Sequence, residues 1–363
     1  MNDATPATIN VSTRGLQSHF DVGFGSRAGQ SVVFPTPRSY QNRAARSPIA
    51  LTDLPCGRRS PYTRGVAAAV ELLQVTKTFG RQIAVDDLSL TVPEGVVYGF
   101  IGPNGSGKTT TLRMIMRIFH PDKGHIRILG EEAWDAVNDR VAYLPEERGL
   151  YKQMTVRDVL AFYAEMKGLR DHRRAIDEWL ERMQLTAHAK KRVASLSKGM
   201  SQKVQFIATV IAKPALVLLD EPFSGLDPVN AVTIREAILE LKKTATVIFS
   251  THDMEVAERM CDGIFMIHRG QKVLDGTLEQ IQDAHGEDSI RVRLDGAVDL
   301  TNLPGVNEVA DFGKLQQLRI DPGTNPQTIL AELMKRGTVR HFELARPSLQ
   351  EIFVRIAKPG HHA

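Results

Sequence analysis

The feature that most constrains the fold is an apolar stretch that runs directly into a glycine-rich segment. Residues 96–102, "VVYGFIG", form a continuous apolar run, which is typical of a β-strand buried on both faces. Residues 103–119, "PNGSGKTTTLRMIMRIF", then predict a glycine loop and a helix with apolar positions Leu112, Ile115, Met116 and Phe119. A buried strand that leads into a helix predicts an α/β fold, in which helices cover a mainly parallel sheet.

Further strands extend this pattern. Residues 70–79, "VELLQVTKTF", and 88–92, "LSLTV", alternate apolar and polar side chains, as half-buried strands do. Residues 215–220, "ALVLLD", and 245–250, "ATVIFS", are short apolar runs that predict two more buried strands. Residues 155–190 carry few strand signals and are predicted to be mostly helical.

The sequence divides into four parts. Residues 1–66 contain neither Lys nor Glu and predict a disordered extension, or a true start of the protein further downstream. An Arg-rich leader can also be a targeting peptide, but this one lacks the apolar core of a secretory signal. Residues 67–286 carry the strand and helix alternation, residues 287–358 predict a small α+β module, and residues 359–363 form a tail.

The α+β module is predicted from three strands and two helices. The strands are "SIRVRL" (289–294), "LQQLRI" (315–320) and "VRHFELA" (339–345). The helices are "PQTILAELMKR" (326–336) and "PSLQEIFVRI" (347–356), the second with Pro347 in its first turn. The module contains no cluster of catalytic residue types.

Charge and cysteine content exclude several function classes. The chain carries a net charge of +4, but residues 1–66 hold eight Arg and three Asp and account for +5, which leaves −1 for the rest. A near-neutral folded part lacks the basic footprint of nucleic-acid binding, so no nucleic acid is expected as a partner. Cys56 and Cys261 form neither a metal-ligand spacing nor a disulfide framework, which fits a reducing, cytosolic setting. The apolar run at 206–219 is interrupted by Lys213 and Pro214, so no membrane span is predicted.

The glycine loop predicts a phosphate site. "GPNGSGKT" (102–109) fits the pattern G-x-x-x-x-G-K-[ST] between a strand and a helix, a context that disfavours a chance match to a glycine-rich turn. Backbone N–H groups of residues 105–110 and the helix dipole would face a β-phosphate, and Lys108 would reach the β/γ oxygens. The Thr109 hydroxyl would bind Mg²⁺. The expected ATP-binding residues here are Gly102, Pro103, Asn104, Gly105, Ser106, Gly107, Lys108, Thr109 and Thr110.

Polar residues end two buried strands at the same sheet edge as this loop. Asp220 is expected to hold Mg²⁺, and Glu221 to activate or orient an attacking water. His252, in "STHD" (250–253), can hydrogen-bond a γ-phosphate. Taken alone, these would be two solvated acids and a surface or core His; beside a phosphate loop they predict a catalytic site. Phe79, before the loop, either stacks on adenine or is a core residue.

A second anion cradle is predicted at "ASLSKGMSQK" (194–203), where a helix begins. Ser197 can cap that helix, and Gly199 lets the backbone approach a phosphate. The site lies far from the first loop in sequence, which raises the question of whose phosphate it holds.

Together these motifs resemble the nucleotide-binding subunit of an ATP-binding cassette (ABC) transporter over residues 67–285. The matching segments are "GPNGSGKT" for Walker A, "LVLLDE" for Walker B and "STHD" for the switch histidine, with Phe79 as the adenine-stacking aromatic. "LSKGM" matches the signature through Leu196, Ser197, Lys198, Gly199 and Met200, and "SGLD" matches the D-loop through Ser224, Gly225, Leu226 and Asp227. The resemblance implies a P-loop core with an antiparallel β subdomain and a helical subdomain.

The sequence departs from the family pattern at two places. Lys198 and Met200 stand where the signature usually has Gly and Gln; family members with this variant are known, so activity is expected. Glu146, in "YLPEERGLY" (143–151), stands where a Gln usually links the γ-phosphate to the helical subdomain. It still offers an oxygen acceptor, so it is expected to bind ATP and to contact Mg²⁺ or water, but it adds negative charge near the phosphates. "YLPEERGLY" and the C-terminal "PSLQEIFV" are similar to the ABC-2-type export branch, which includes sodium-efflux-like and multidrug-like ATPases with a small C-terminal domain.

The resemblance implies how the chain works. ATP, with Mg²⁺, would bind between two cassettes arranged head to tail, as a homodimer or with a paralogue, so the signature would contact the partner's ATP. A chain without a membrane span implies separate permease subunits, with residues around 146–155 as the contact and the inner face of the cell membrane as the location. One alternative is a soluble, non-transport ABC ATPase. The other is a regulatory cassette without activity; the presence of Lys108, Asp220 and Glu221 argues against this second alternative.

Overall fold

The structure is a computed structural model, and it describes part of the chain. The described residues are 67–132, 138–147, 149–285, 289–296, 298–300, 302–311, 313, 315–321 and 323–357. The predictions for residues 1–66 and for the tail at 359–363 lie outside the described residues.

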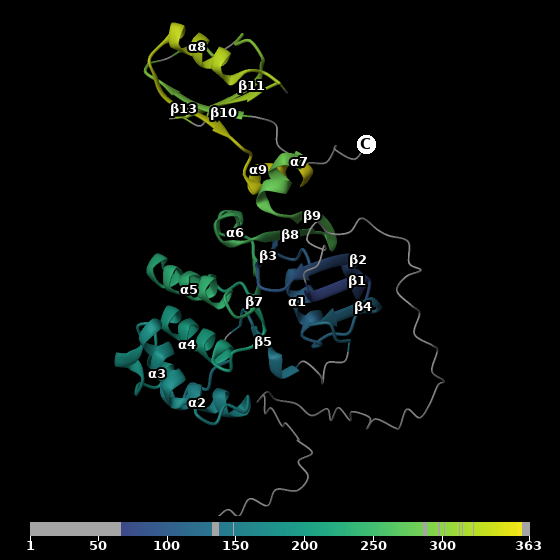
Figure 1. Cartoon of the computed structure of the whole chain (residues 1–363), viewed down its shortest axis with the longest axis vertical. Helices are drawn as coiled ribbons and strands as arrows, with labels where there is room; N and C mark the ends of the chain where they lie inside the picture. Colours follow the sequence, from purple (N-terminus) through teal and green to yellow (C-terminus); the bar gives the residue numbers. More distant parts are fainter. Residues whose placement is uncertain are drawn as a thin grey trace, which may run out of the picture. The chain divides into compact units, whose positions relative to one another are not determined.

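A six-stranded sheet forms the centre of the α/β fold (Figure 1). Its strand order is β5-β6-β7-β3-β8-β9; all neighbours are parallel except the antiparallel pair β8–β9. β3, β6 and β7 are buried along their whole length, which confirms the strands predicted from continuous apolar runs. The strands are β3 (Val97–Ile101), β5 (Val141–Leu144), β6 (Leu216–Asp220), β7 (Thr246–Thr251), β8 (Gly263–His268) and β9 (Gln271–Gly276).

An antiparallel sheet packs on one side of the central sheet together with helix α1 (Lys108–Ile115). Its order is β2-β1-β4, formed by β1 (Ala68–Phe79), β2 (Gln82–Pro93) and β4 (Lys123–Ile128). The prediction that the α1 helix extends to Phe119 was wrong. Arg117 adopts a positive φ of 56°, and its guanidinium donates to the carbonyl of Ile126 at 2.8 Å, which fixes the chain in a turn after the helix.

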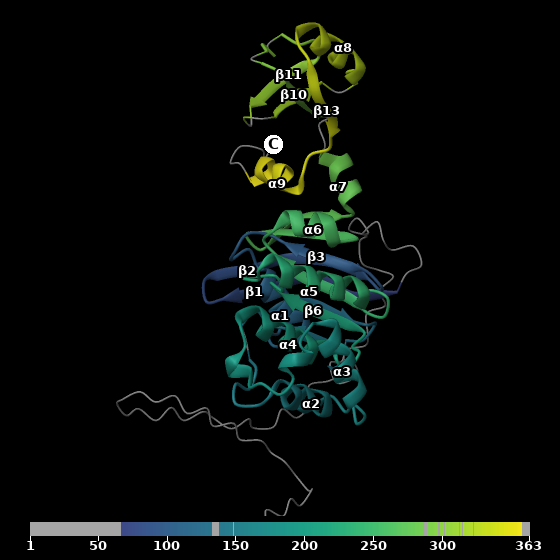
Figure 2. The ribbon, with the colours of Figure 1, turned by 90° about the vertical axis from the view of Figure 1, so that its left-hand side faces the viewer.

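Helices cover the other side of the central sheet, as Figures 1 and 2 show for α2, α3, α4 and α5. They share one core with β3, β6 and β7. The mostly helical prediction for residues 155–190 is confirmed. The helices are α2 (Val156–Met166), α3 (Arg173–Arg182), α4 (Lys198–Val210), α5 (Pro228–Leu241) and α6 (Met254–Met260), with short 3-10 turns at Asn138–Arg140, Thr186–His188 and Val193–Ser195. Among the described residues, no helix is both long and apolar enough to cross a membrane.

The C-terminal region contains a four-stranded antiparallel sheet of order β11-β12-β10-β13 and one helix on it. Its strands are β10 (Ser289–Leu294), β11 (Val306–Asp311), β12 (Gln316–Ile320) and β13 (Val339–Ala345), and its helix is α8 (Pro326–Arg336). β11 was not predicted, because it is a largely exposed edge strand with little apolar pattern. Two further helices, α7 (Leu278–His285) and α9 (Leu349–Ala357), flank this region in sequence.

Helix α9 packs away from that sheet. It shares a core with α6, α7 and strands β8 and β9, through Leu349, Ile352 and Phe353. The Leu349 N–H also donates to the Glu258 carboxylate of α6. The prediction that Pro347 lies in the first turn of this helix was wrong: Ser348 caps it in a reciprocal pair with Glu351, so Pro347 precedes the cap.

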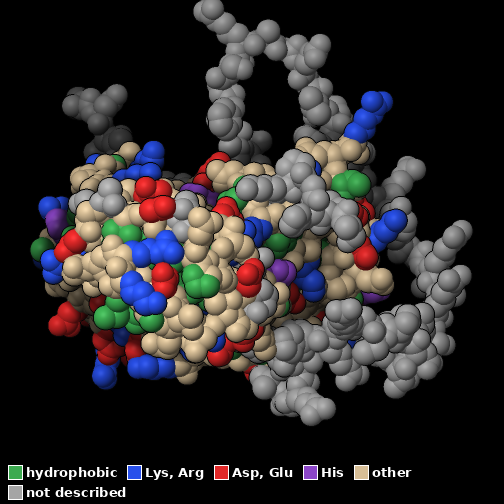
Figure 3. All heavy atoms as spheres, turned by 90° about the horizontal axis from the view of Figure 1, so that it is seen from above, with side chains coloured by type: hydrophobic (Ala, Val, Ile, Leu, Met, Phe, Trp, Pro, Cys, Tyr) green, Lys and Arg blue, Asp and Glu red, His purple; other side chains and the backbone are tan. Residues whose placement is uncertain are grey.

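Charged side chains of both signs are mixed on the face drawn in Figure 3, where Lys and Arg lie among Asp and Glu. This distribution matches the net charge of −1 that remains outside residues 1–66.

Candidate functional site

The loop between β3 and α1 is shaped by three glycines in left-handed conformations. A Cβ on Gly102 would lie 2.2 Å from the carbonyl oxygen of Ile267, and one on Gly107 would lie 2.6 Å from that of Ala84. These two glycines therefore let the loop pack against neighbouring backbone. Gly105 differs: its φ is +77°, but nothing lies within 4 Å of a Cβ built there. Its space is open, as a cradle for an anion requires.

Lys108 is buried in this loop, and its ammonium is held by groups of the same chain. It donates to the carbonyl oxygens of Gly102 at 2.7 Å and Pro103 at 3.3 Å. The Glu221 carboxylate lies 3.5 Å from the Lys108 Nζ atom, and both side chains are at least nine-tenths buried. A second polar group of the loop, the Ser106 hydroxyl, is buried and has no partner among the described residues. A ligand oxygen in the loop would satisfy it.

Asp220 is the centre of a hydroxyl network at the end of β6. Its carboxylate accepts hydrogen bonds from Ser250 at 2.6 Å, from Thr109 at 3.1 Å and from Tyr143 at 3.1 Å. Burial, followed by the negative charge of Asp220, raises the pKa of Tyr143 to about 12. Sequence reasoning missed the role of Tyr143, because nothing in the local pattern of β5 indicates that its hydroxyl reaches the next strand.

The pair Thr109 and Asp220 fits a magnesium site. Mg²⁺ in proteins is often held by one or two carboxylates and a hydroxyl together with substrate phosphates. A hydroxyl and a carboxylate of this kind meet at 3.1 Å beside the phosphate loop. Among the described residues, no group of three or more His, Cys, Asp or Glu side chains is placed to hold a metal ion.

Glu221 and His252 form a second pair next to this network. Glu221 has a positive φ of 49°, which turns its side chain away from the direction of Asp220. Its N–H donates to the Ser250 hydroxyl at 2.9 Å, so the same hydroxyl links both acids. The Nδ1 atom of His252 lies 3.1 Å and 3.2 Å from the two Glu221 oxygens. The His252 side chain is 57% exposed and borders open space.

One cavity of about 370 Å³ collects most of the predicted ATP-binding residues. Phe79 lines it and is 44% exposed, with its ring edge-on to Phe119 at 5.3 Å. This exposure contradicts the alternative of a core Phe. Glu146 also lines the cavity, so the predicted Gln-equivalent position does face the site. The lining residues are Phe79, Gln82, Ala84, Asn104, Gly105, Ser106, Gly107, Lys108, Thr109, Thr110, Glu146 and Glu221.

The signature residues begin α4 and are not among the residues that line this cavity. Ser197 caps the helix, because its hydroxyl accepts from the Met200 N–H at 3.2 Å. A Cβ on Gly199 would lie 2.5 Å from the Asn230 side chain, so this glycine allows α4 and α5 to approach. Leu196 and Met200 pack against the core beneath.

The D-loop residues 224–227 lie next to the signature within the same chain. Asp227 caps α5 by accepting from the N–H groups of Asn230 at 3.0 Å and Val229 at 3.1 Å. The bonds from the Asn230 N–H and from the Asn230 side chain are the main causes that lower the pKa of Asp227. The Lys198 ammonium lies over Gly225, only 1.9 Å from where a Cβ on that glycine would stand. Lys198 therefore contacts the D-loop of its own chain, which sequence reasoning left open.

Comparisons with known proteins agree with this geometry. The family model "ABC transporter" matches residues 85–224, and the model "ATP-binding protein DrrA1-3-like, C-terminal domain" matches residues 276–357. The chain is 42% identical over 288 residues to the uncharacterized ABC transporter ATP-binding protein YhaQ of Bacillus subtilis (strain 168), covering 77% of this chain and 95% of the relative.

Two further matches extend the comparison. The chain is 33% identical over 299 residues to the Nod factor export ATP-binding protein I of Burkholderia pseudomallei (strain 1710b), covering 80% of this chain and 97% of the relative. A solved "ATP binding subunit of ABC transporter" is 32% identical with a TM-score of 0.56, covering 60% of this chain and 92% of that one. These matches and the cavity geometry show that the chain belongs to the ATP-binding proteins of ABC transporters, a family whose members are ATPases.

Proposed function

We propose that this chain binds and hydrolyses ATP to drive export through a separate permease of the ABC-2 type. The observation that carries the proposal is the buried contact between Lys108 and Glu221 on the wall of the 370 Å³ cavity. The Lys108 ammonium would hold a terminal phosphate, and the Glu221 carboxylate would act on a water beside that phosphate. The contact places these two groups next to each other.

The phosphates would bind along the loop. The open space at Gly105, the partnerless Ser106 hydroxyl and the N–H groups at the start of α1 all favour an anion there. Lys108 would exchange its carbonyl partners for phosphate oxygens. Thr109 and Asp220 would hold Mg²⁺, which supplies charge stabilisation to the phosphates when bound. Phe79, exposed beside the loop, would stack on the adenine ring.

Glu221 would orient the attacking water and take its proton. Its carboxylate is buried and held between Lys108 and His252, which fixes its position at the cavity wall. His252 is exposed on one side and would donate to the terminal phosphate while it orients Glu221. The backbone turn at Glu221 separates the two acids, so Asp220 and Glu221 take different roles.

We further propose that two such chains, or one chain and a paralogue, close head to tail on ATP. In this arrangement the signature residues 196–200 and the D-loop residues 224–227 would meet the partner's nucleotide. The structure of one chain supports this arrangement in two ways. Ser197 and Lys198 are exposed at the start of α4, and neither lines the nucleotide cavity of its own chain.

Export through a permease is supported by the relatives. One relative is an ATP-binding protein of Nod factor export, and residues 276–357 match the C-terminal domain of DrrA1-3-like ATP-binding proteins. We propose that the chain acts at the inner face of the cell membrane, where the exposed Tyr151 and neighbouring residues of 146–155 contact the permease.

The experiment that tests this proposal is affinity purification of the tagged chain from detergent-solubilised membranes. An integral membrane protein should co-purify, and the ATPase rate of the reconstituted pair should exceed that of the chain alone. Lys108→Ala is the matched control, because it should keep the partner and lose turnover. Recovery of the chain with ribosomes, and with no membrane protein, would support the non-transport alternative.

A further inference from the structure

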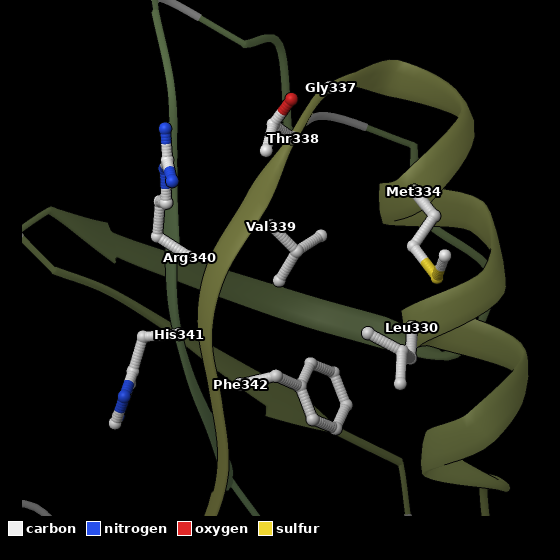
Figure 4. Close-up of a pocket in the computed structure, with 8 residues that line it drawn as sticks. All are labelled: Leu330, Met334, Gly337, Thr338, Val339, Arg340, His341 and Phe342. Carbon is white, nitrogen blue, oxygen red and sulfur yellow. The ribbon is translucent and has the colours of Figure 1, made fainter.

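The C-terminal sheet has an edge strand beside an open apolar groove. β13 lies at one end of the order β11-β12-β10-β13 and pairs only with β10 among the described residues. A groove of about 540 Å³ lies between β13 and α8. Figure 4 shows Leu330 and Met334 of α8 directed toward Val339 and Phe342 of β13, with Arg340 and His341 on the other side of the strand.

Exposed apolar side chains lie at opposite ends of this edge. Leu344 is opposite the core residue Ile290 in the register with β10, so it is on the same face of the sheet as α8, yet it is 57% exposed. Met334, at the end of α8 next to Val339, is 66% exposed. An edge strand with free backbone groups and an apolar stripe is a template for pairing with another strand.

We propose that β13 pairs antiparallel with β13 of a second copy of this chain, about a two-fold axis at Phe342. In this register His341 of each copy lies opposite Glu343 of the other. The Nε2 atom of His341 already lies 3.2 Å from a carboxylate oxygen of Glu343 in its own chain, so the two pairs would form one network of alternating imidazoles and carboxylates. A register centred on Glu343 would put two carboxylates opposite each other, and one centred on His341 would put two imidazoles opposite each other. Charge complementarity therefore selects the Phe342 register.

The same register fits the apolar side chains. Antiparallel pairing brings Leu344 of one copy beside Arg340 of the other, next to Val339 and the Met334 end of the groove. A β-bulge already separates His341 and Val339 there, because Arg340 has no direct partner on β10. Arg340 is also drawn back toward its own Asp295, at 2.7 Å and 2.8 Å. The two-fold axis repeats the contact, which gives a self-complementary interface.

The opposite edge of the sheet is protected against this kind of pairing. β11 carries Glu308 and Asp311, and its apolar residue Val309 is 42% exposed. Both charged side chains of β11 are acidic, so pairing with a second copy would bring like charges together, whereas β13 carries charges of both signs. The side chains of β13 therefore favour pairing with a second copy, and those of β11 disfavour it.

The test is the oligomeric state of the full chain without nucleotide, measured by sedimentation velocity. The wild type should be a dimer, and Leu344→Lys should raise its dissociation constant about tenfold or more, since a positive charge would enter the contact beside Arg340 of the other copy. Val309→Lys, an equivalent change on β11, is the matched control and should leave the dimer intact. A monomeric wild type, or equal effects of the two variants, would overturn the proposal.

Cysteine cross-linking tests the register in a chain whose own two cysteines are replaced by Ser. A mixture of His341→Cys and Glu343→Cys chains should form a disulfide-linked dimer under mild oxidation, since opposite residues in a strand pair lie within reach. Neither variant should cross-link alone; self-linked His341→Cys would overturn the Phe342 register.

Lys108→Ala should leave the dimer unchanged, so its loss of ATPase activity would bear on the proposed function alone. Protection of β13 from hydrogen exchange only when permease is added would assign the edge to the permease and overturn self-pairing.

Discussion

The Lys108 ammonium lies 3.5 Å from the Glu221 carboxylate, with both groups buried. In this arrangement the proposed phosphate-binding cation is partly neutralised by the proposed base. An incoming phosphate would compete with Glu221 for Lys108, and the competition couples nucleotide binding to the freedom of the carboxylate. Two catalytic roles that the sequence assigns separately are thus joined by one contact.

Glu221→Gln tests this coupling. Turnover should fall by at least about a hundredfold, because removal of a general base costs that order of rate. ATP affinity should stay equal or rise, because an anion beside Lys108 is lost. Phosphate release and equilibrium nucleotide binding measure the two effects. Glu146→Gln lines the same cavity and keeps an oxygen acceptor, so it should retain turnover; equal losses in both variants would contradict the role of Glu221.

The glycines of the phosphate loop should differ in their tolerance of a methyl group. Gly105→Ala should fold with a cost of about 1–2 kcal/mol for its left-handed backbone and lose ATP binding, since the Cβ enters the open cradle. Gly107→Ala should destabilise the fold further, because its Cβ meets the Ala84 carbonyl at 2.6 Å. Denaturant unfolding and nucleotide binding separate the cases. Gly105→Ala with full ATP affinity would contradict the proposed cradle.

Ser197→Ala should lower the free energy of unfolding by about 1 kcal/mol through loss of the α4 cap and should also reduce hydrolysis in the ATP-bound dimer. Thr155→Ala removes a cap of the same geometry from α2, at 3.2 Å to the Asp158 N–H. It should cost similar stability and leave hydrolysis unchanged. Ser197→Arg should keep ATP binding and stop hydrolysis. If the two Ala variants lost equal activity, the effect of Ser197 would be structural.

The raised pKa of Tyr143 predicts that the free energy of unfolding falls at high pH. Its pKa is raised from 10.0 to about 12 in the folded chain, so the folded state holds the proton more tightly than the unfolded state. This contribution is complete below pH 10 and is lost as the pH rises through about 12. Wild type should therefore lose unfolding free energy over this range faster than Tyr143→Phe in urea titrations at stepped pH. Tyr151→Phe, an exposed position, should follow the wild type.

The sequence predicts those parts of the site that depend on local pattern. "GPNGSGKT", the apolar strands that end at Asp220 and Ser250, and the cap at Ser197 each carry their signal within a few residues. Continuous apolar strands need no partner information, because burial on both faces forces their composition. The site residues in the cavity, and the central sheet that positions them, could be inferred in this way.

Contacts between segments that are distant in sequence could not be predicted, because no local sequence pattern indicates them. The Tyr143 hydroxyl reaches Asp220 only because β5 pairs with β6, and Lys198 lies on Gly225 only because α4 meets the D-loop. Arg117 ends α1 through carbonyls that come later in the chain. In each case a local pattern was compatible with several outcomes, and tertiary packing chose one.

The position of α9 has a consequence for synthesis and for engineering. Its core with α6, α7 and β8 is interrupted in sequence by β10–β13 and α8, so that core stays open until residues 349–356 have left the ribosome. Cutting the chain at residue 286 would remove Leu349 and Ile352 and leave an apolar face on the ATPase. A shortened cassette would therefore need these residues supplied in trans, or polar replacements on α6, to stay soluble.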